Sequence, residues 1–238
     1  MFSTVRDFDD FYKTREGRLV RRVLRQAISS YADFSKNNVG IGYSTPYIES
    51  ALSIFPVSLK ILDDDGKRLN NVTCADLSAL PLESSSLDTV IFAHGLESCE
   101  YPEDVLKEIS RVLKSEGRLI MIVPNRRGLW AHCEWSPFGH GRPFSAAQLR
   151  FLFSETAFVC DEMKSVLFTP PLKWRVMLRL SSFFEKYCPY VLSTMGGVNI
   201  AVARKQTYAP IKPSKGTAVP VRSVLRPLVT KSTYTGKE

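Results

Sequence analysis

Short apolar runs alternate with helical stretches through the middle of this chain, and this alternation limits the folds that it can adopt. The expected strands cover residues 39–41, 59–62, 72–74, 87–93 and 118–123. Helices are expected between them at residues 46–55 and 102–113. Because strands separated by helices pair in parallel, the pattern predicts an α/β fold with a doubly wound, mostly parallel sheet and helices on both faces.

The segment before this region has the pattern of an amphipathic helix over residues 7–31. Its apolar side faces away from a side that carries four arginines, Arg18, Arg21, Arg22 and Arg25. We expect a helix that docks on the core and leaves the arginines in solvent, as most surface helices do. The alternative is a basic helix that rests on an anionic membrane.

The segment after this region contains one helix with a clear start signal. Ser145 and Gln148 form the pattern of a capping box, which predicts a helix over residues 145–154. Strands are expected at 159–168 and 198–203, with a helix at 173–187 between them.

Charge and composition divide the chain into three parts. Hydrophobic residues make up 44% and charged residues 24%, which excludes a disordered or disulfide-stapled chain. Of the net charge of +8, residues 206–238 contribute six basic residues and one acidic residue, hence +5. We expect an N-terminal helical segment at 1–36, an α/β domain at 37–205, and a disordered, proline-containing basic tail at 206–238.

The same composition bears on where the protein works. No apolar run approaches the roughly 20 residues that a membrane-spanning helix needs, and residues 1–7 lack the apolar stretch of a secretory signal. Five cysteines are scattered singly along the chain. We therefore expect reduced thiols and a cytoplasmic protein.

Polar and glycine residues follow each expected strand, where ligands bind in an open α/β sheet. They are Gly40 and Gly42, Asp63 to Asp65, Asp76, His94 with Gly95 and Glu97, and Asn125 to Arg127. Each has a structural alternative. The glycines can serve turn geometry alone, the acidic cluster can be a solvated turn, and Asp76 can cap the turn that follows it.

A long run of residues then matches a known family. Its parts are the segments CADL (74–77), LPL (80–82), SLDTV (86–90), HGLE (94–97), LKEISRVLK (106–114) and GRL (117–119). At this spacing the chain resembles the type 11, quinone-biosynthesis-like branch of the class I S-adenosylmethionine-dependent methyltransferases. The segments GYSTP (42–46), PNRRGLW (124–130) and PFGHGRP (137–143) resemble a bacterial subgroup of it. The resemblance covers about residues 39–205.

This resemblance implies a cofactor and a set of cofactor-binding residues. S-adenosyl-L-methionine would lie with its methionine part against Gly40, Gly42 and Tyr43. An acid of the 63–65 cluster would hold the ribose, either Asp63 or the favoured Asp64. Asp76 would meet the adenine amine, Leu77 would pack on the adenine ring, and His94 would face the sulfonium.

Two positions depart from the family pattern. Asn38 stands where the family has a carboxylate, and Ser44 stands where it has a third glycine. The first change removes a charge that helps bind the cofactor's ammonium group, and the second adds bulk at a close approach of the backbone. The resemblance is therefore clearer about the fold than about activity.

The irregular stretch after residue 124 is the expected substrate wall. Its flat apolar groups and cations would suit an aromatic or anionic acceptor: Arg126, Arg127, Trp130, Phe138 and Arg142. The alternative is that Trp130 and Phe138 pack the loop on the core while the arginines are solvated. His94 and His140 are the candidate general bases. No histidine or cysteine spacing is typical of a metal site.

The resemblance thus implies S-adenosylmethionine-dependent methyl transfer to a small-molecule acceptor. The main alternative is a non-catalytic binding or regulatory protein on the same scaffold, which Asn38 and Ser44 would favour. A nicotinamide-dependent oxidoreductase is a third and weaker reading. Contact with nucleic acid or an anionic membrane through the tail or the N-terminal helix is the less favoured kind of partnership.

Overall fold

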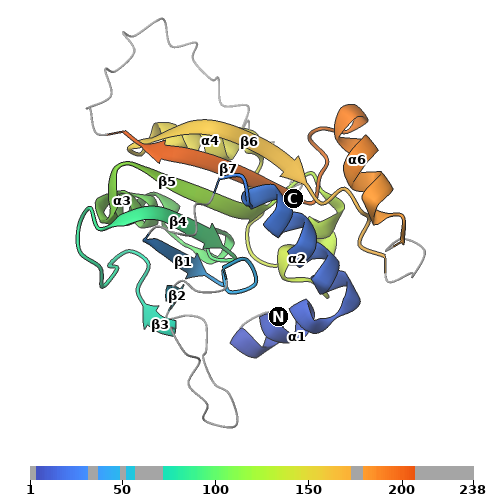
Figure 1. Ribbon diagram of the computed structural model, residues 1–238, viewed down its shortest axis with the longest axis horizontal. Helices are drawn as coiled ribbons and strands as arrows, with labels where there is room; N and C mark the ends of the chain where they lie inside the picture. The colour runs from blue at the N-terminus through green and yellow to red at the C-terminus, as the bar shows by residue number, and fades with distance from the viewer. Residues whose placement is uncertain (1–3, 32–36, 49–51, 57–71, 173–178, 207–238) are drawn as a thin grey trace, which may run out of the picture.

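The computed structural model describes residues 4–31, 37–48, 52–56, 72–172 and 179–206. Within them lies a seven-stranded sheet of order β3-β2-β1-β4-β5-β7-β6 (Figure 1). Its strands are β1 (Asn38–Gly42), β2 (Leu52–Pro56), β3 (Val72–Ala75), β4 (Leu87–Ala93), β5 (Leu113–Pro124), β6 (Phe158–Val166) and β7 (Val198–Lys205). Strands β1 to β5 pair in parallel, and β7 runs antiparallel to both β5 and β6. The predicted doubly wound, mostly parallel sheet is confirmed.

Helices cover both faces of the sheet (Figure 1). They are α1 (Val5–Lys13), α2 (Arg15–Ile28), α3 (Pro102–Val112), α4 (Ala146–Ser154) and α6 (Ser181–Val191). Short 3₁₀ turns cover Leu96–Ser98, Leu129–His132 and Pro137–Gly139. One core cluster joins α3 and α4 to one face of the sheet, and a second joins α1 and α2 to the other. The site described below draws Tyr12, Tyr43 and Tyr47 from the second cluster and Leu77 from the first.

The N-terminal segment is two helices rather than the single helix predicted over 7–31. The chain breaks at Thr14, whose hydroxyl accepts a hydrogen bond from the N–H of Gly17 at 3.0 Å and caps α2. A Cβ on Gly17 would lie 2.1 Å from the carbonyl oxygen of Phe11, so glycine permits the close packing of the two helices. The break turns Phe8, Phe11 and Tyr12 toward the sheet edge, where all three are buried.

The second strand is the clearest error of the sequence prediction. The helix expected at 46–55 is wrong, because residues 52–56 form β2 and pair in parallel with β1. Its side chains of Ser53, Ile54 and Phe55 are all buried, and a short strand buried on both faces shows no alternation. The expected strand at 59–62 lies outside the described residues, as do Asp63 to Asp65.

Most other elements are confirmed with small changes at their ends. The strand at 87–93 has the predicted limits, and the capped helix near 145–154 is α4, with both hydrogen bonds of its capping box present. The helix expected at 173–187 is observed as α6, at 181–191, while residues 173–178 are outside the description. The tail at 206–238 is also outside it, apart from Gln206, so its predicted disorder stays a prediction.

Candidate cofactor and active site

The carboxyl ends of β1 and β4 lie side by side at the centre of the sheet. Gly42 pairs with Ala93, so the turn after β1 meets the turn that begins at His94. Both turns use left-handed backbone, with φ of +69° at Gly42 and +51° at His94. A non-glycine residue in this conformation is uncommon, and such residues gather at functional sites.

Four buried polar residues form what we call the His94 network: Tyr12, Tyr47, His94 and Glu97. The Tyr12 hydroxyl lies 2.6 Å from Nε2 of His94 and 2.5 Å from the Tyr47 hydroxyl. On the other side of the ring, Nδ1 of His94 lies 3.5 Å from Oε1 of Glu97. Helix α1, the turn after β1 and the turn after β4 therefore meet at one imidazole.

The hydrogen bonds of the network limit where its protons can lie. A neutral His94 whose Nε2 accepts from a tyrosine O–H would carry its ring proton on Nδ1, toward the Glu97 carboxyl group. Among the described residues, Nδ1 of His94 and Oε2 of Glu97 have no hydrogen-bond partner. Buried polar atoms usually have one, so these two atoms can still interact with a ligand or water.

Three tyrosines in or beside this network should make the folded protein less stable at alkaline pH. Burial raises the pKa of the hydroxyls of Tyr12, Tyr43 and Tyr47 above the ordinary value of 10.0. The folded protein then holds these protons when the unfolded chain has lost them. The free energy of unfolding should therefore fall as pH rises above 10, by about 1.4 kcal/mol per pH unit for each tyrosine.

Urea unfolding of Tyr47→Phe at several alkaline pH values tests this dependence. In this variant the free energy of unfolding should fall less steeply with pH, by one tyrosine's contribution to the slope, whatever its stability at neutral pH. Tyr101→Phe is the matched control, because Tyr101 is 64% exposed and its removal should leave the slope unchanged. Equal slopes for Tyr47→Phe and the wild type would contradict the prediction.

Ser44 and Ala93 fill the space above the glycines of the β1 turn. A Cβ on Gly40 would lie 1.9 Å from the Ser44 Oγ, and one on Gly42 would lie 2.1 Å from the Ala93 carbonyl oxygen. Above this turn, the Phe8 ring of α1 stacks on the Tyr43 ring with centroids 4.8 Å apart. The chain itself thus occupies the surroundings of both glycines.

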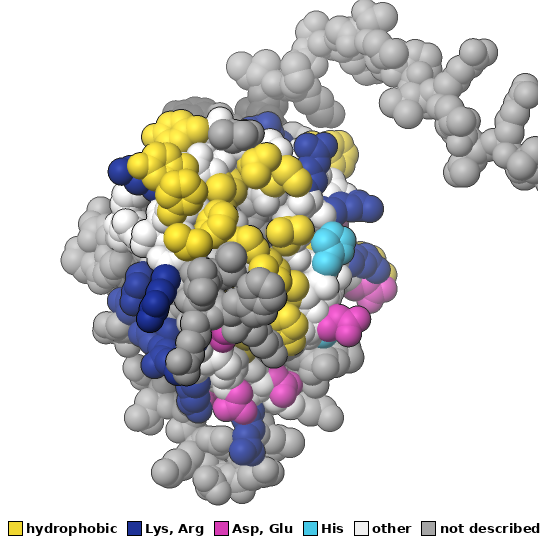
Figure 2. Space-filling model, turned by 90° about the vertical axis from the view of Figure 1, so that its right-hand side faces the viewer, with side chains coloured by type: hydrophobic (Ala, Val, Ile, Leu, Met, Phe, Trp, Pro, Cys, Tyr) yellow, Lys and Arg dark blue, Asp and Glu magenta, His cyan; other side chains and the backbone are white. Residues whose placement is uncertain are grey.

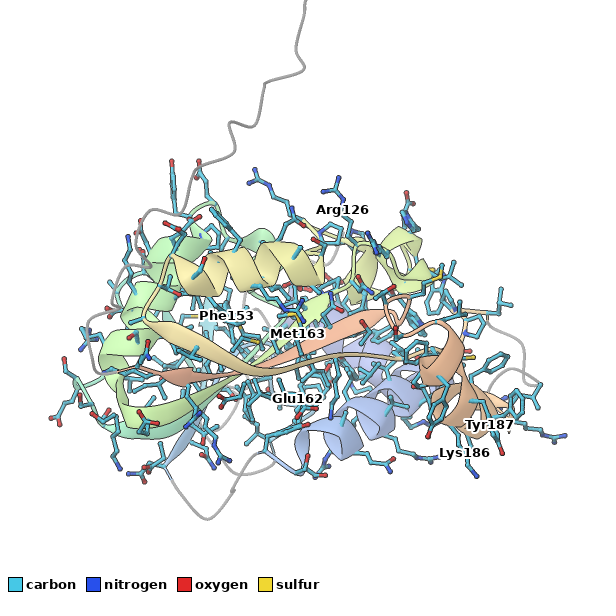
Figure 3. The ribbon with its side chains drawn as sticks, turned by 90° about the horizontal axis from the view of Figure 1, so that it is seen from above. Arg126, Phe153, Glu162, Met163, Lys186 and Tyr187 are labelled. Atoms are coloured by element: carbon cyan, nitrogen blue, oxygen red, sulfur yellow. The ribbon has the colours of Figure 1, made fainter. Side chains whose placement is uncertain are left out.

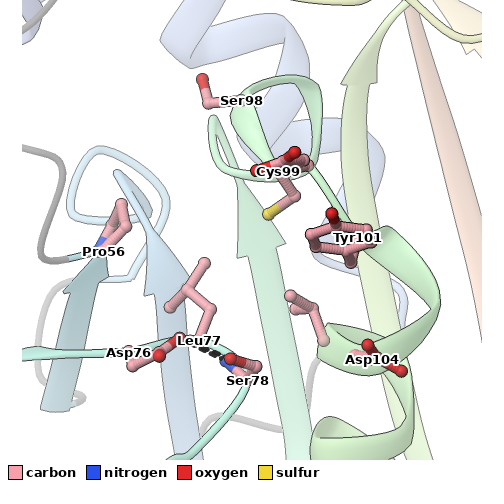
Figure 4. A pocket seen from close by; sticks show the side chains of 10 residues that line it. Pro56, Asp76, Leu77, Ser78, Ser98, Cys99, Tyr101 and Asp104 are labelled. Atoms are coloured by element: carbon pink, nitrogen blue, oxygen red, sulfur yellow. Dashed lines mark hydrogen bonds between the residues drawn. The ribbon is translucent and has the colours of Figure 1, made fainter.

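A cavity of about 400 Å³ opens beside β2 and β3, at the same edge of the sheet (Figure 4). Asp76, Leu77 and Pro56 line one side of it, and Cys99 and Tyr101 line the other. Oδ1 of Asp76 accepts hydrogen bonds from the N–H and the hydroxyl of Ser78, which lower the pKa of the carboxyl group. Oδ2 takes part in neither bond, and Asp76 is exposed.

The thiol in the cavity has a different character. Burial raises the pKa of Cys99 to about 11, with the Glu97 carboxylate a smaller cause, so this cysteine is a protonated thiol at neutral pH. None of the five cysteines is in a disulfide. Cys99 therefore contributes an apolar wall rather than a nucleophile.

The structure separates the residues of the expected substrate wall. Trp130 and Phe138 are buried, at 2% and 1% exposure, and belong to the core cluster beneath the loop. Arg126, Arg127 and Arg142 are exposed. His140 is half-buried, and its Nε2 lies 2.7 Å from the carbonyl oxygen of Glu134.

Sequence reasoning did not assign a role to three members of the His94 network. Glu97 was one of several polar residues after a strand, and Tyr47 fell in the wrongly predicted helix. Tyr12 belongs to an aromatic i, i+3, i+4 face with Phe8 and Phe11, which indicates burial but not what the face covers. Its contact with His94 spans 82 positions of sequence and needed the fold to be visible.

Comparison with known proteins finds one matching family model. Residues 32–121 match the family described as "Methyltransferase domain", type 11. This part of the chain is therefore similar to a methyltransferase domain. A curated relative, the mitochondrial 2-methoxy-6-polyprenyl-1,4-benzoquinol methylase of Caenorhabditis elegans, is 37% identical over 49 residues. The alignment covers 21% of this chain and 17% of that protein.

Solved structures agree on the fold of the methyltransferase domain. A SAM-dependent methyltransferase from Thermotoga maritima, described as a possible histamine N-methyltransferase, is similar with a TM-score of 0.58 and 19% identity. It covers 85% of this chain and 96% of its own. A SAM-dependent methyltransferase from Archaeoglobus fulgidus has a TM-score of 0.55 and 18% identity, with 83% and 97% covered.

The matched family implies S-adenosylmethionine as the cofactor. The two ends of this molecule would meet different surroundings here. The cavity at Asp76 and Leu77 fits the nucleoside end, because it is open and has a carboxylate for an amine and an apolar wall for a ring. Gly40 is instead closed over by the side chains of Ser44 and Ile48. Binding of the methionine end here would therefore require this turn or α1 to move.

The described residues include no group of three or more His, Cys, Asp or Glu side chains that could hold a metal ion. Within the same residues, no helix is both long enough and apolar enough to cross a membrane.

Proposed function

We propose that this methyltransferase domain transfers a methyl group from S-adenosylmethionine to a small-molecule acceptor. The observation that carries the proposal is the open cavity at Asp76 and Leu77, which lies outside the carboxyl ends of the strands, where ligands bind in an open α/β sheet. When bound, the cofactor supplies a methyl group on an electrophilic sulfonium. The protein's part is then to position the acceptor and to take up its proton.

The cofactor-binding residues have distinct proposed roles. Asp76 accepts a hydrogen bond from the adenine amine, and Leu77 packs on the ring. Gly40, Gly42 and Tyr43 border the methionine part. Asp63 or Asp64 holds the ribose, although β2 ends at Pro56 and these acids come seven positions or more later in the chain.

His94 is the proposed proton acceptor. Its Nε2 is the basic atom in the tautomer described above, and the Tyr12 hydroxyl now occupies the place at which an acceptor O–H or N–H would bind. Glu97 orients the ring from Nδ1, as carboxylates do for catalytic imidazoles. Exchange of Tyr12 for the acceptor requires α1 to move away from the sheet edge.

The exposed arginines are the proposed contacts of an anionic acceptor. The N–H of Arg142 donates to the carbonyl oxygen of Glu97 at 2.8 Å, which ties its loop to the His94 network. Arg126 and Arg127 follow β5 at the same edge. Trp130 and Phe138 hold this loop from beneath, and His140 stays an untested second candidate base.

Calorimetric titration of the full chain with S-adenosylhomocysteine tests the proposal. The wild type should bind it, and NAD should produce no binding heat. Asp76→Ala should weaken binding about 10- to 100-fold, because a hydrogen bond to a charged group contributes about 1.5–3 kcal/mol.

Asp104→Ala is the matched control for Asp76→Ala. Asp104 is an exposed acid at the same cavity, but it lies on α3 and pairs with Lys107 at 2.8 Å. This variant should bind like the wild type. No binding by the wild type, or an equal loss in both variants, would contradict the proposed cofactor site.

A further inference from the structure

Helix α6 and the turn after it expose a set of large apolar side chains. Tyr190 is 87% exposed, Phe183 57% and Tyr187 49%, and these three follow one another at i, i+4 and i+7 on one helix face. Figure 3 shows Tyr187 and Lys186 pointing away from the body of the protein. We call the following residues the α6 patch: Leu180, Phe183, Tyr187, Tyr190, Leu192 and Met195.

A carboxylate on the inner side of α6 fixes the direction of this patch. Glu185 accepts hydrogen bonds from the N–H groups of Leu167 and Thr169 and from the Thr169 hydroxyl, at 2.9 to 3.1 Å. Ser181, one turn earlier, is buried. The inner side of α6 thus carries Ser181 and Glu185 with the half-buried Phe184 and Cys188. The rings of Phe183, Tyr187 and Tyr190 stay in solvent, although an ordinary surface helix buries such rings.

Cations lie next to the α6 patch. A hollow of about 340 Å³ separates α6 from α2, and Arg22 of α2 and Lys186 of α6 both line it. Arg18 lies one turn before Arg22 and is exposed, as is Arg179 beside the start of α6. Figure 2 shows a large hydrophobic area above a column of basic side chains on this face.

We propose that this face docks on the surface of an anionic lipid bilayer. Tyrosine and phenylalanine side chains suit the boundary between headgroups and acyl chains, where a ring is buried while a hydroxyl stays hydrated. Arginine and lysine beside them suit anionic headgroups. In this arrangement the α6 patch would rest in the headgroup region of one leaflet.

Charge and chemistry favour this partner over two others. A second copy of the chain that packed through this face would bring a surface with the same cations, Arg18, Arg22 and Lys186, near this one, and like charges repel. A nucleic acid would satisfy the cations but would gain little from aliphatic side chains such as Leu180, Leu192 and Met195. A bilayer of anionic lipid satisfies both parts of the surface.

Co-sedimentation of the full chain with vesicles tests the proposal. Vesicles of phosphatidylcholine mixed with phosphatidylglycerol should bind the protein, and phosphatidylcholine alone should bind it much more weakly. Raising the salt concentration should reduce binding to the mixed vesicles. The double variants Phe183→Ser/Tyr187→Ser and Arg18→Glu/Arg22→Glu should each lower the partition coefficient by about tenfold or more.

The matched control is Arg150→Glu/Phe151→Ser on α4, which packs on the other face of the sheet. Phe151 is 66% exposed, so this control removes a comparable ring and a cation from a different surface. It should bind vesicles like the wild type. Circular dichroism and thermal melting should show that all three variants are folded.

Four results would overturn the proposal. They are equal binding to both kinds of vesicle, unchanged binding by the α6 double variant, a wild-type dimer in light scattering that this variant dissociates, and tight RNA binding that the same variant abolishes. Unchanged binding by the α6 variant would assign any vesicle affinity to another basic segment, such as residues 206–238.

Discussion

Replacing Trp130 by alanine should lower the free energy of unfolding by about 3–5 kcal/mol, the usual cost of deleting a buried tryptophan side chain. Trp130 is 2% exposed. The centroid of its ring lies 5.7 Å from that of the Trp135 ring and 5.9 Å from that of the Phe138 ring. Its indole N–H donates to the carbonyl oxygen of Thr169 at 2.8 Å. The substitution would leave a cavity and a buried acceptor without its donor.

Chemical unfolding of two further variants locates the source of this effect. Trp130→Phe keeps most of the ring and loses the indole N–H, so its loss of stability should lie between those of the wild type and Trp130→Ala. Leu129→Ala is the control, since Leu129 is the neighbouring residue and is 57% exposed. It should change stability by less than about 0.5 kcal/mol. If Trp130→Ala unfolds like this control, the buried ring does not stabilise the fold and the prediction is wrong.

A strand of the sheet could be predicted when its own residues are apolar enough to show that the strand is buried. The run 87–93 is apolar at nearly every position, and β4 has those limits. Helix α4 follows from a local hydrogen-bond pattern, that of Ser145 and Gln148. In both cases the physical cause of the element lies within a few neighbouring residues, so the sequence carries it directly.

The second strand and the N-terminal break were not predictable in the same way. The segment 46–55 has apolar residues that suit a helix, but Leu52–Pro56 gains more as a strand between β1 and β3. The break at Thr14 depends on the Gly17–Phe11 approach, which only the packed helices reveal. Tertiary contacts decide both elements.

The sequence predicted where the candidate site lies, but only some of the residues that form it. The topology placed the strand ends at one edge, and His94 lies there as expected. The Tyr12 contact was not visible, because nothing in residues 5–13 indicates which buried atom their aromatic face meets. The separation of the arginines from Trp130 also depended on packing, since flat apolar groups suit a core as well as a ligand.

Gly42→Ala should lower the free energy of unfolding by about 2–4 kcal/mol. Gly42 has φ of +69°, where a side chain costs roughly 1–2 kcal/mol. An added Cβ would lie 2.1 Å from the Ala93 carbonyl oxygen, a contact with backbone that only a shift of the β1 or β4 strand end can relieve. Overpacking of this kind costs about 1–3 kcal/mol more. The reduced freedom of the unfolded chain offsets up to about 1 kcal/mol of the total.

Thermal unfolding distinguishes this strain from an effect on ligand binding. In a chain of this length, the melting temperature should fall by about 5–15 °C without any cofactor present. Thr45→Ala, at an exposed position in the same turn, should melt close to the wild type. An unchanged melting temperature for Gly42→Ala would mean that the strand ends can separate at little cost. Since α1 and the β1 turn close this edge, that freedom would also give the methionine end of the cofactor its way in.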